Sequence, residues 1–382
     1  PRESWDYKAT ANMIAATVTI DGKPRRVLMQ QPTNGFFYVL DRETGKLISA
    51  EKVGKVSWAS HIDMTTGRPV ETANAHYQEG PVDIYPSTLG SHNWQAMSYS
   101  PQTGLAYIPY MQAGARYAKA DKGFLASITG ASASFITQKR DKDDLTGALL
   151  AWDPVAQKAR WTVEHPGPWN GGLLATGGGL VFQGTTGSEF NAYDAGTGKK
   201  LWSFAAQTGV VAPPVTYTVN GEQYVAVLAG WGGAYALVVD GDLIKRKAPV
   251  RNISRLLVFK LGGKAALPAE PALAALPLDP PPSKAAPEVI ALGQTKYARY
   301  CSTCHAPAAV GSTVLPDLRR AGSLESAQAW NAVVEGGILK DNGMASFAGS
   351  LSKAEIEAIR AYVIHRANED KALDSAKKVA RR

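Results

Sequence analysis

The sequence predicts an all-β domain over residues 1–263 and an all-α domain over residues 288–370. Short apolar strands broken by Gly, Asn and Asp turns fill the first part, with almost no helical periodicity. A Pro- and Ala-rich stretch at 264–287 separates these strands from three segments with amphipathic helical periodicity. We therefore expect two globular domains joined by a semi-rigid linker, with a basic tail at residues 371–382.

Length and composition agree with this division. The chain has 382 residues, of which 45% are hydrophobic and 19% charged, so it suits two or three soluble globular domains. The net charge of +8 is dispersed apart from the tail, so we expect no nucleic-acid partner. No run of eighteen apolar residues occurs, so we expect no membrane span.

Two hairpins are predicted in the β domain. Asp21-Gly22 separates apolar runs at 15–20 and 25–30, and Asn220-Gly221 separates runs at 214–219 and 223–228. Such two-residue turns need positive φ angles, which Gly adopts freely and Asn and Asp tolerate.

An acidic turn of the form Asp-x-x-Thr-Gly recurs along the β domain. The copies and variants are Asp41 to Gly45, Asp63 to Gly67, Ser100 to Gly104, Asp153 to Gln157 and Asp194 to Gly198. Two of them are followed by a tryptophan, Trp161 and Trp202, and preceded by an apolar strand. Strand, acidic turn and strand with Trp form a unit typical of a propeller blade, whose Trp packs against the next blade. About four or five blades fit before residue 262, which leaves an open edge.

Three helices are predicted after the linker. They cover residues 288–300, residues 323–335, and a segment that begins at Ser352 and ends near Ala367. Ser352 and Glu355 form a capping box, the usual start of such a helix.

Both cysteines of the chain stand in Cys301-Ser302-Thr303-Cys304-His305. This spacing is typical of covalent haem c attachment, in which the thiols become thioethers and the histidine ligates the iron. A structural zinc site needs four ligands and the chain has no third cysteine. A thioredoxin-like redox pair gives no reason for His305.

The second axial ligand is predicted to be Met344, the only methionine after residue 262 and about forty residues beyond His305. A methionine that fills a gap in the core is the alternative, and His365 is a competing nitrogen ligand on the third helix. Residues 287–368 resemble the class I cytochromes c. The resemblance implies that the Pro316 carbonyl orients His305 and that Arg319 meets a haem propionate.

The chain begins at Pro1 without a signal peptide, although haem c is attached on the exported side of a membrane. We therefore expect that further sequence precedes Pro1 and that the protein is periplasmic.

Several motifs in one order resemble the quinohaemoprotein alcohol dehydrogenases, which use pyrroloquinoline quinone (PQQ) and haem c. The motifs are Trp5-Asp6-Tyr7, Asn34-Gly35-Phe36-Phe37-Tyr38, His92-Asn93-Trp94, Leu150-Ala151-Trp152-Asp153-Pro154, Pro168-Trp169-Asn170-Gly171-Gly172 and Gly230-Trp231-Gly232-Gly233. The resemblance implies that the β domain is about the C-terminal half of an eight-bladed PQQ-dehydrogenase propeller, and that the all-α domain is a class I cytochrome c.

The resemblance also implies site residues. Asp6 matches the catalytic base and lies near a calcium ion that polarises the quinone. An ordinary Asp in a turn is the alternative. Relatives that use a lanthanide carry an added aspartate two positions later; Lys8 stands there, so calcium is expected.

Asn93, Trp94 and Val211 match positions at or near PQQ, with a turn amide, a core Trp and a core Val as alternatives. Thr33 stands where the family usually has a lysine that reaches the quinone oxygens. Losing that cation weakens stabilisation of the reduced quinone. Arg25 or Arg26 is a candidate replacement.

Three functions follow as hypotheses. The first is oxidation of a small alcohol by PQQ, with single electrons passing to the haem and on to a soluble acceptor such as a small copper protein or cytochrome c. The second is a cytochrome on a propeller that has lost quinone chemistry. The third is a propeller scaffold that binds proteins, which leaves Asp6 without a purpose.

Overall fold

The computed structural model describes residues 3–119, 133–138, 141–165, 167–231, 253–270, 277–305, 307–311 and 316–379. Among these residues it separates into two compact units, the first ending at Pro268 and the second beginning at Ala269. Parts of three predicted features lie outside the described residues, namely Gly232-Gly233, residues 271–276 of the linker and residues 380–382 of the tail.

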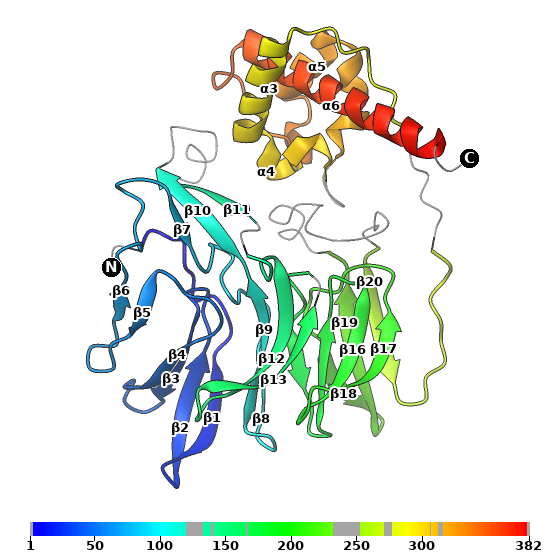
Figure 1. Ribbon diagram of the computed structural model, residues 1–382. Coiled ribbons are helices and arrows are strands. Elements are labelled where there is room, and N and C mark those ends of the chain that lie inside the picture. The colour runs from blue at the N-terminus through cyan, green and yellow to red at the C-terminus, as the bar shows by residue number, and fades with distance from the viewer. Residues whose placement is uncertain are drawn as a thin grey trace. The chain divides into compact units, whose positions relative to one another are not determined.

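Within the described residues, the first unit contains four antiparallel sheets built from strands close together in the chain (Figure 1). Their orders are β1-β2-β3-β4, β8-β9-β12-β13, β14-β15-β16-β17 and β18-β19-β20. The bounds are β1 Ile14–Ile20, β2 Lys23–Gln30, β3 Phe36–Asp41, β4 Leu47–Lys52, β8 Ser98–Ser100, β9 Leu105–Gln112, β12 Thr146–Asp153, β13 Lys158–His165, β14 Leu173–Ala175, β15 Leu180–Gly184, β16 Glu189–Asp194, β17 Lys200–Ala205, β18 Val215–Val219, β19 Glu222–Ala229 and β20 Arg255–Lys260.

Two smaller sheets accompany these four. One pairs β5 with β6, and the other has the order β11-β10-β7. Their bounds are β5 Ala59–Ile62, β6 Pro69–Glu71, β7 Val82–Ile84, β10 Gly114–Lys119 and β11 Ala133–Gln138. The all-β class predicted for this part of the chain is confirmed.

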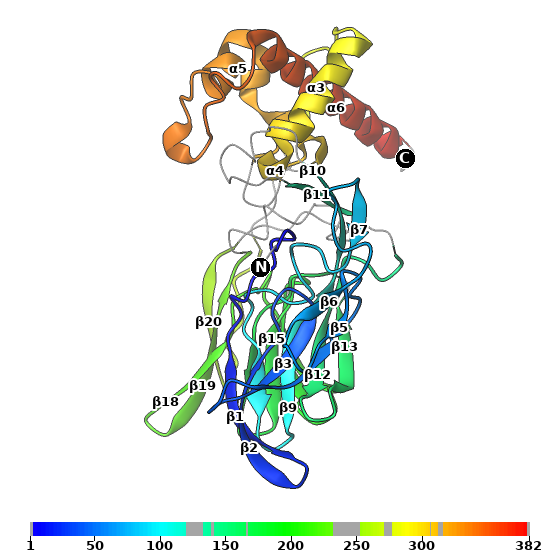
Figure 2. The same ribbon diagram turned by 90° about the vertical axis from the view of Figure 1, so that its left-hand side faces the viewer.

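Both predicted hairpins are present. Asp21 and Gly22 have φ angles of 50° and 70°, and Asn220 and Gly221 have φ angles of 52° and 80°. In Figures 1 and 2 the β1–β2 and β18–β19 hairpins extend toward the same end of the unit.

The acidic turns share one geometry. Asp41 Oδ1 accepts hydrogen bonds from the backbone N–H groups of Glu43 and Thr44, over 3.0 and 2.9 Å. Asp63, Asp153 and Asp194 accept from the residues two and three positions later in the same way. The repeat is therefore a structural device: one carboxylate oxygen satisfies the free amides of each turn.

The tryptophans after two of these turns join neighbouring sheets, as predicted. Trp161 on β13 donates its indole N–H to the Ala195 carbonyl over 3.2 Å. A Cβ atom on Gly198 would lie 2.6 Å from the same ring, so the turn that follows β16 needs glycine there. Trp202 on β17 meets Phe259 on β20 edge-on, with ring centroids 5.2 Å apart. Such contacts between blades give the unit its propeller-type packing.

The second unit is helical. Its helices are α3 Pro287–Tyr300, α4 Ser302–His305, α5 Ala327–Val334 and α6 Lys353–Val379, with short 3-10 turns at Pro307–Ala309, Leu318–Arg320, Gly322–Glu325 and Lys340–Asn342. Helices α3 and α6 approach closely at Gly293, where a Cβ atom would collide with the Ala358 carbonyl. The predicted all-α class is confirmed.

Two helix boundaries were predicted wrongly. Helix α5 begins at Ala327 because the Ser326 hydroxyl caps it by accepting the Ala329 N–H over 3.1 Å. Helix α6 opens with the predicted capping box, in which the Ser352 N–H donates to Glu355 over 2.8 Å. It continues past Ala367 to Val379, since residues 367–379 contain no Gly or Pro and many good helix formers. Much of the predicted basic tail is therefore helix.

None of the helices within the described residues combines the length and apolar character needed to cross a bilayer.

Candidate functional site

The cysteines and histidine of the haem-attachment motif are gathered in one tight turn at the end of α3. The backbone N–H groups of Cys304 and His305 both donate to the Cys301 carbonyl, over 3.1 and 2.9 Å. Cys301 is buried, Cys304 is exposed, and both thiols are free. The turn therefore presents two thiols and one imidazole together, as attachment to a single haem requires.

His305 is held in the form that binds iron. Its Nδ1 lies 3.2 Å from the Pro316 carbonyl oxygen, the contact predicted for this residue. A carbonyl only accepts, so Nδ1 carries the proton and Nε2 keeps its lone pair. Burial lowers the pKa of His305, which also favours the neutral ring.

A zinc site fits this segment poorly. The turn offers two cysteines and His305, one ligand fewer than the four that a structural zinc site needs. In addition, no three His, Cys, Asp or Glu side chains gather around a point that could hold a metal ion, as far as the chain is described.

Met344 lies in the loop between the last 3-10 turn and α6. Its side chain is partly buried against the core of the helical unit. Phe347, further along the same loop, meets Tyr300 edge-on with ring centroids 6.1 Å apart, and Tyr300 directly precedes Cys301. The loop thus approaches the haem-attachment segment. His365 instead stands 37% exposed on α6, with Nε2 3.3 Å from Glu369.

We expect Met344→Ala to remove the thioether-to-iron absorption band of the oxidised haem protein and to lower its reduction potential, because the sulfur ligand stabilises the reduced iron. Met64→Ala, at a methionine that is 49% exposed in the β unit, is the matched control. Visible spectra and a redox titration of both variants decide the matter, and an unchanged band in Met344→Ala would contradict the assignment.

Arg319 is engaged by carboxylates. Its Nε and Nη2 donate to the two oxygens of Asp317, over 2.8 and 2.7 Å, and Nη1 donates to Asp370 over 2.7 Å. These bonds use three of the five N–H groups of the guanidinium and tie the segment after Pro316 to α6. The propionate contact stays a prediction.

Asp6 stands on a segment fixed by its aromatic neighbours. Trp5 is buried, donates its indole N–H to the Ala75 carbonyl over 2.6 Å, and packs against Trp58 with ring centroids 4.8 Å apart. Asp6 itself has a φ angle of 60° and a side chain that is 65% exposed. Its Oδ2 accepts a hydrogen bond from Thr88 over 2.8 Å. A carboxylate held this way is available to solvent and to a substrate.

Lys8 completes the surroundings of Asp6. Its ammonium lies 2.8 Å from Asp6 Oδ2 and 2.9 Å from the Asp6 carbonyl oxygen. The backbone of Lys8 is paired with Thr33: the Thr33 N–H and hydroxyl donate to the Lys8 carbonyl over 3.1 and 3.0 Å. Thr33 is buried and serves this pairing.

Asn93 is linked to Asp6 through Thr88 and Leu89. Thr88, which contacts Asp6, directly precedes Leu89, and the Asn93 amide donates to the Leu89 carbonyl over 2.8 Å. Asn93 is buried, whereas Trp94 is 42% exposed and meets Trp169 edge-on, with ring centroids 6.5 Å apart.

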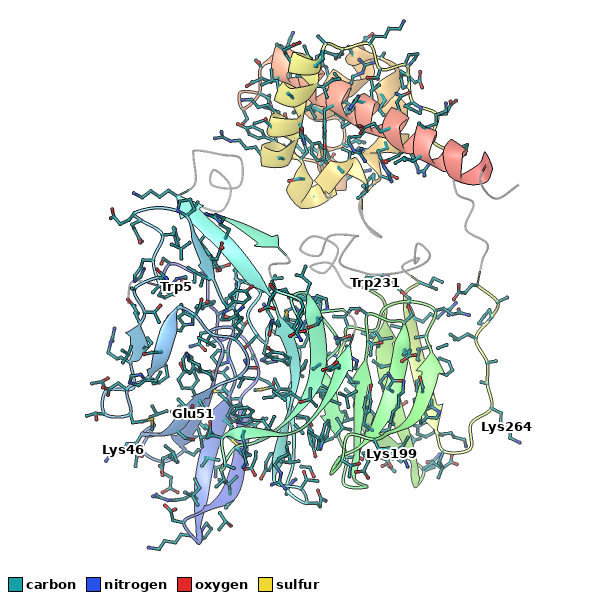
Figure 3. The ribbon with its side chains drawn as sticks, in the orientation of Figure 1. Trp5, Lys46, Glu51, Lys199, Trp231 and Lys264 are labelled. Carbon is teal, nitrogen blue, oxygen red and sulfur yellow. The ribbon has the colours of Figure 1, made fainter. Side chains whose placement is uncertain are left out.

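Val211 contacts the loop that contains Trp169. Trp169 belongs to the loop before β14, and Gly172 of that loop donates its N–H to the Val211 carbonyl over 3.4 Å. Val211 is buried. A series of contacts between loops thus connects Asp6 through Thr88 to the segment of Asn93 and Trp94, and connects Trp94 through the Trp169 loop to Val211. In Figure 3, Trp5 and Trp231 lie toward one end of the sheets, while Lys46 and Lys199, which follow two acidic turns, lie toward the other.

Two family models match the chain. One describes the beta-propeller domain of glucose/ethanol/alcohol dehydrogenases and covers residues 137–225. The other describes subunit III of cbb3-type cytochrome c oxidase and covers residues 288–363.

Curated relatives match both units at once. The quinohemoprotein alcohol dehydrogenase ADH IIB of Pseudomonas putida is 47% identical over 97% of this chain and 54% of that protein. The chain is homologous to the quinohaemoprotein alcohol dehydrogenases. The dehydrogenase subunit of the alcohol dehydrogenase (quinone) of Komagataeibacter europaeus is 41% identical over 97% of this chain and 52% of that protein. The chain spans about half the length of the curated relatives it matches.

Solved structures agree. The quinohemoprotein alcohol dehydrogenase ADHIIG of Pseudomonas putida HK5 has a TM-score of 0.85 and 41% identity, covering 95% of this chain and 55% of that one. The enzyme of Comamonas testosteroni has a TM-score of 0.81 and 38% identity, covering 96% and 54%. A europium-containing methanol dehydrogenase has a TM-score of 0.56 and 35% identity, covering 60% and 41%.

The residues present fit the groups that quinohaemoproteins carry. For haem, the fit lies in the free thiols and the neutral, oriented imidazole described above. A polar cofactor such as PQQ is supported by buried polar atoms without a hydrogen-bond partner in residues next to Trp94, in sequence or by ring contact. The buried indole N–H of Trp169 and both amide atoms of Gln95 lack a hydrogen-bond partner among the described residues. Buried groups of this kind are normally satisfied by a ligand or by water.

The described residues provide fewer ligands for calcium than for haem. Asp6 Oδ1 accepts from no hydrogen-bond donor within the described residues, so it is open to a substrate proton or to a cation. The described side chains nevertheless hold no cluster of three or more metal-binding residues, and Ca²⁺ takes six to eight oxygen ligands. This part of the chain alone does not complete a calcium site.

The suggestion that Arg25 or Arg26 replaces the missing lysine at position 33 was wrong. Arg25 lies 3.6 Å from Asp41, and Arg26 donates to Glu43 over 2.9 Å. Both stand near the start of β2, whereas Thr33 follows its end. Both guanidinium groups therefore form ion pairs with carboxylates of the acidic turn that begins at Asp41, at the opposite end of β2 from Thr33.

A cavity of about 530 Å³ lies beside the Trp5 segment. Its lining residues are Glu3, Trp5, Tyr7, Asn34, Trp58, Gly67, Arg68, Pro69 and Glu71. Asp6, Asn93 and Trp94 do not line it, so we do not assign it to the quinone.

Sequence reasoning missed Thr88 and the contact of Lys8 with Asp6. Thr88 stands in an unremarkable loop before Asn93 and carries no sequence signal. Lys8 was noted only as a departure from the lanthanide pattern.

Proposed function

We propose that the intact protein containing this chain oxidises small alcohols with PQQ and passes the electrons singly to a haem c. The haem is attached at Cys301 and Cys304, and a soluble acceptor such as a small copper protein or cytochrome c takes the electrons from it. One observation carries the proposal: similarity to quinohemoprotein alcohol dehydrogenases over 97% of the chain spans both the Asp6 neighbourhood and the haem-attachment turn.

Asp6 is the proton acceptor in this proposal. Its Oδ2 is held by Lys8 and Thr88, over 2.8 Å in each case, which leaves Oδ1 to take the proton from the alcohol hydroxyl. The quinone supplies a two-electron acceptor for the hydrogen that leaves the alcohol carbon with its bonding electrons. Asn93, Trp94 and Val211 are the residues we assign to cofactor binding; Asn93 and Val211 are buried, whereas Trp94 is 42% exposed.

Calcium is the metal we propose near Asp6. An additional carboxylate at position 8 would favour a trivalent ion. Position 8 is instead a lysine, whose ammonium group lies beside Asp6, so a divalent ion is the better match. His305 and Met344 would hold the haem iron, and Arg319 is a candidate for a propionate contact. We place the protein in the periplasm because covalent haem attachment takes place on the exported side of a membrane.

The test is alcohol-dependent dye reduction by the intact protein, with and without PQQ and calcium. We expect activity only when PQQ is present. Bound haem without any PQQ-dependent activity would reject this function and favour the electron-transfer alternative, for which the uncharged Thr33 is the specific observation.

A further inference from the structure

Lys8 occupies a position that fold stability does not explain. The Lys8 and Asp6 side chains are 38% and 65% exposed, and ion pairs this exposed contribute little to stability. The ammonium nevertheless has three oxygen atoms within reach, since Thr88 Oγ1 lies 3.5 Å away in addition to the two Asp6 oxygens. A lysine head group with that many partners is positioned rather than freely solvated.

The backbone places it there. The φ angle of 60° at Asp6 bends the chain so that the side chain of residue 8 folds back over residue 6. The Lys8 N–H donates to Thr33 Oγ1 over 2.5 Å, and the Thr33 hydroxyl donates in turn to the Lys8 carbonyl over 3.0 Å. Thr33 therefore fixes both backbone groups of Lys8, the N–H and the carbonyl. The Lys8 side chain extends from this fixed backbone toward Asp6.

We propose that Lys8 is a further functional residue of the Asp6 site, in which role it supplies the cation that position 33 lacks. This inference rests on the function proposed above. The ammonium holds Asp6 Oδ2, so that Oδ1 faces the substrate, and it places one positive charge where the reduced cofactor becomes more negative.

Lys8→Met keeps the length of the side chain and removes the charge. In the intact protein we expect PQQ to bind about ten- to a hundredfold more weakly, the usual effect of losing a hydrogen bond to a charged group. The reduction potential of the bound quinone is also expected to fall. Equilibrium dialysis with PQQ and calcium and a redox titration measure both quantities. Lys8→Arg keeps the charge and should retain most of the affinity.

The matched control is Lys46→Met, at an exposed lysine at the other end of the sheet (Figure 3). It should bind PQQ as the wild type does.

The PQQ affinities of these proteins distinguish failure of the inference from failure of the proposed function. Wild-type affinity and potential in Lys8→Met would overturn the inference while leaving the proposed function intact. Loss of PQQ affinity in Lys46→Met as large as in Lys8→Met would also contradict the inference, because the effect would then not depend on the position of the charge. If the wild type binds no PQQ at all, the proposed function itself fails and this inference fails with it.

Discussion

Turnover of alcohol by an Asp6→Asn variant of the intact protein is expected to fall at least about a hundredfold, while PQQ and haem stay bound. An amide cannot take the hydroxyl proton, yet it keeps the size of the side chain and an oxygen for the hydrogen bond from Thr88. Asn also tolerates the positive φ angle of 60° at this position. The loss should therefore appear in the rate and leave the fold unchanged.

The matched control is Asp21→Asn, since Asp21 also has a positive φ angle, 50°, and lies in the β1–β2 turn. Steady-state oxidation with PQQ and calcium saturating gives the rates, and dialysis gives the cofactor content. Near wild-type activity in Asp6→Asn would remove Asp6 from the mechanism.

Removing both thiols, in the double variant Cys301→Ala and Cys304→Ala, is expected to abolish covalent haem completely. These two residues are the only cysteines of the chain, and both belong to the Cys-x-x-Cys-His motif that attaches haem c. Haem staining after denaturing electrophoresis is the measurement, because haem held only by iron ligands is lost there.

Cys304→Ala alone is the control for folding around the haem. Cys304 is exposed, so its loss creates no cavity, and the buried Cys301 can still form one thioether. We expect haem to remain covalently bound in this variant with a shifted absorption band. Haem that stays on the denatured double variant would contradict the attachment site.

The parts of the fold that could be predicted depend on local chemistry. The hairpin at Asp21-Gly22 and the acidic turn at Asp41 follow from residues within a few positions of each other, whose side chains and φ preferences determine the turn. The start of α6 follows from the Ser352 and Glu355 pair in the same way. The end of α6 was not predicted correctly. No Gly or Pro follows Ala367 to stop the helix, and residues with high helix propensity extend it to Val379.

The site depends on contacts between distant residues, which a single sequence does not reveal. Thr33 was read as a lost cation, whereas the structure shows it paired with Lys8, 25 positions away. Thr88 reaches Asp6 from 82 positions away. The haem-attachment turn, by contrast, needs only five consecutive residues and was recognised from spacing alone.

The central claim is that electrons from an alcohol reach the haem of the same chain. Rapid anaerobic mixing of alcohol with the oxidised intact protein, loaded with PQQ and calcium, tests it directly by following the haem absorption bands. We expect the haem to become reduced at a rate that rises with alcohol concentration and vanishes without PQQ. A haem that chemical reductant reduces but alcohol leaves oxidised would contradict the account.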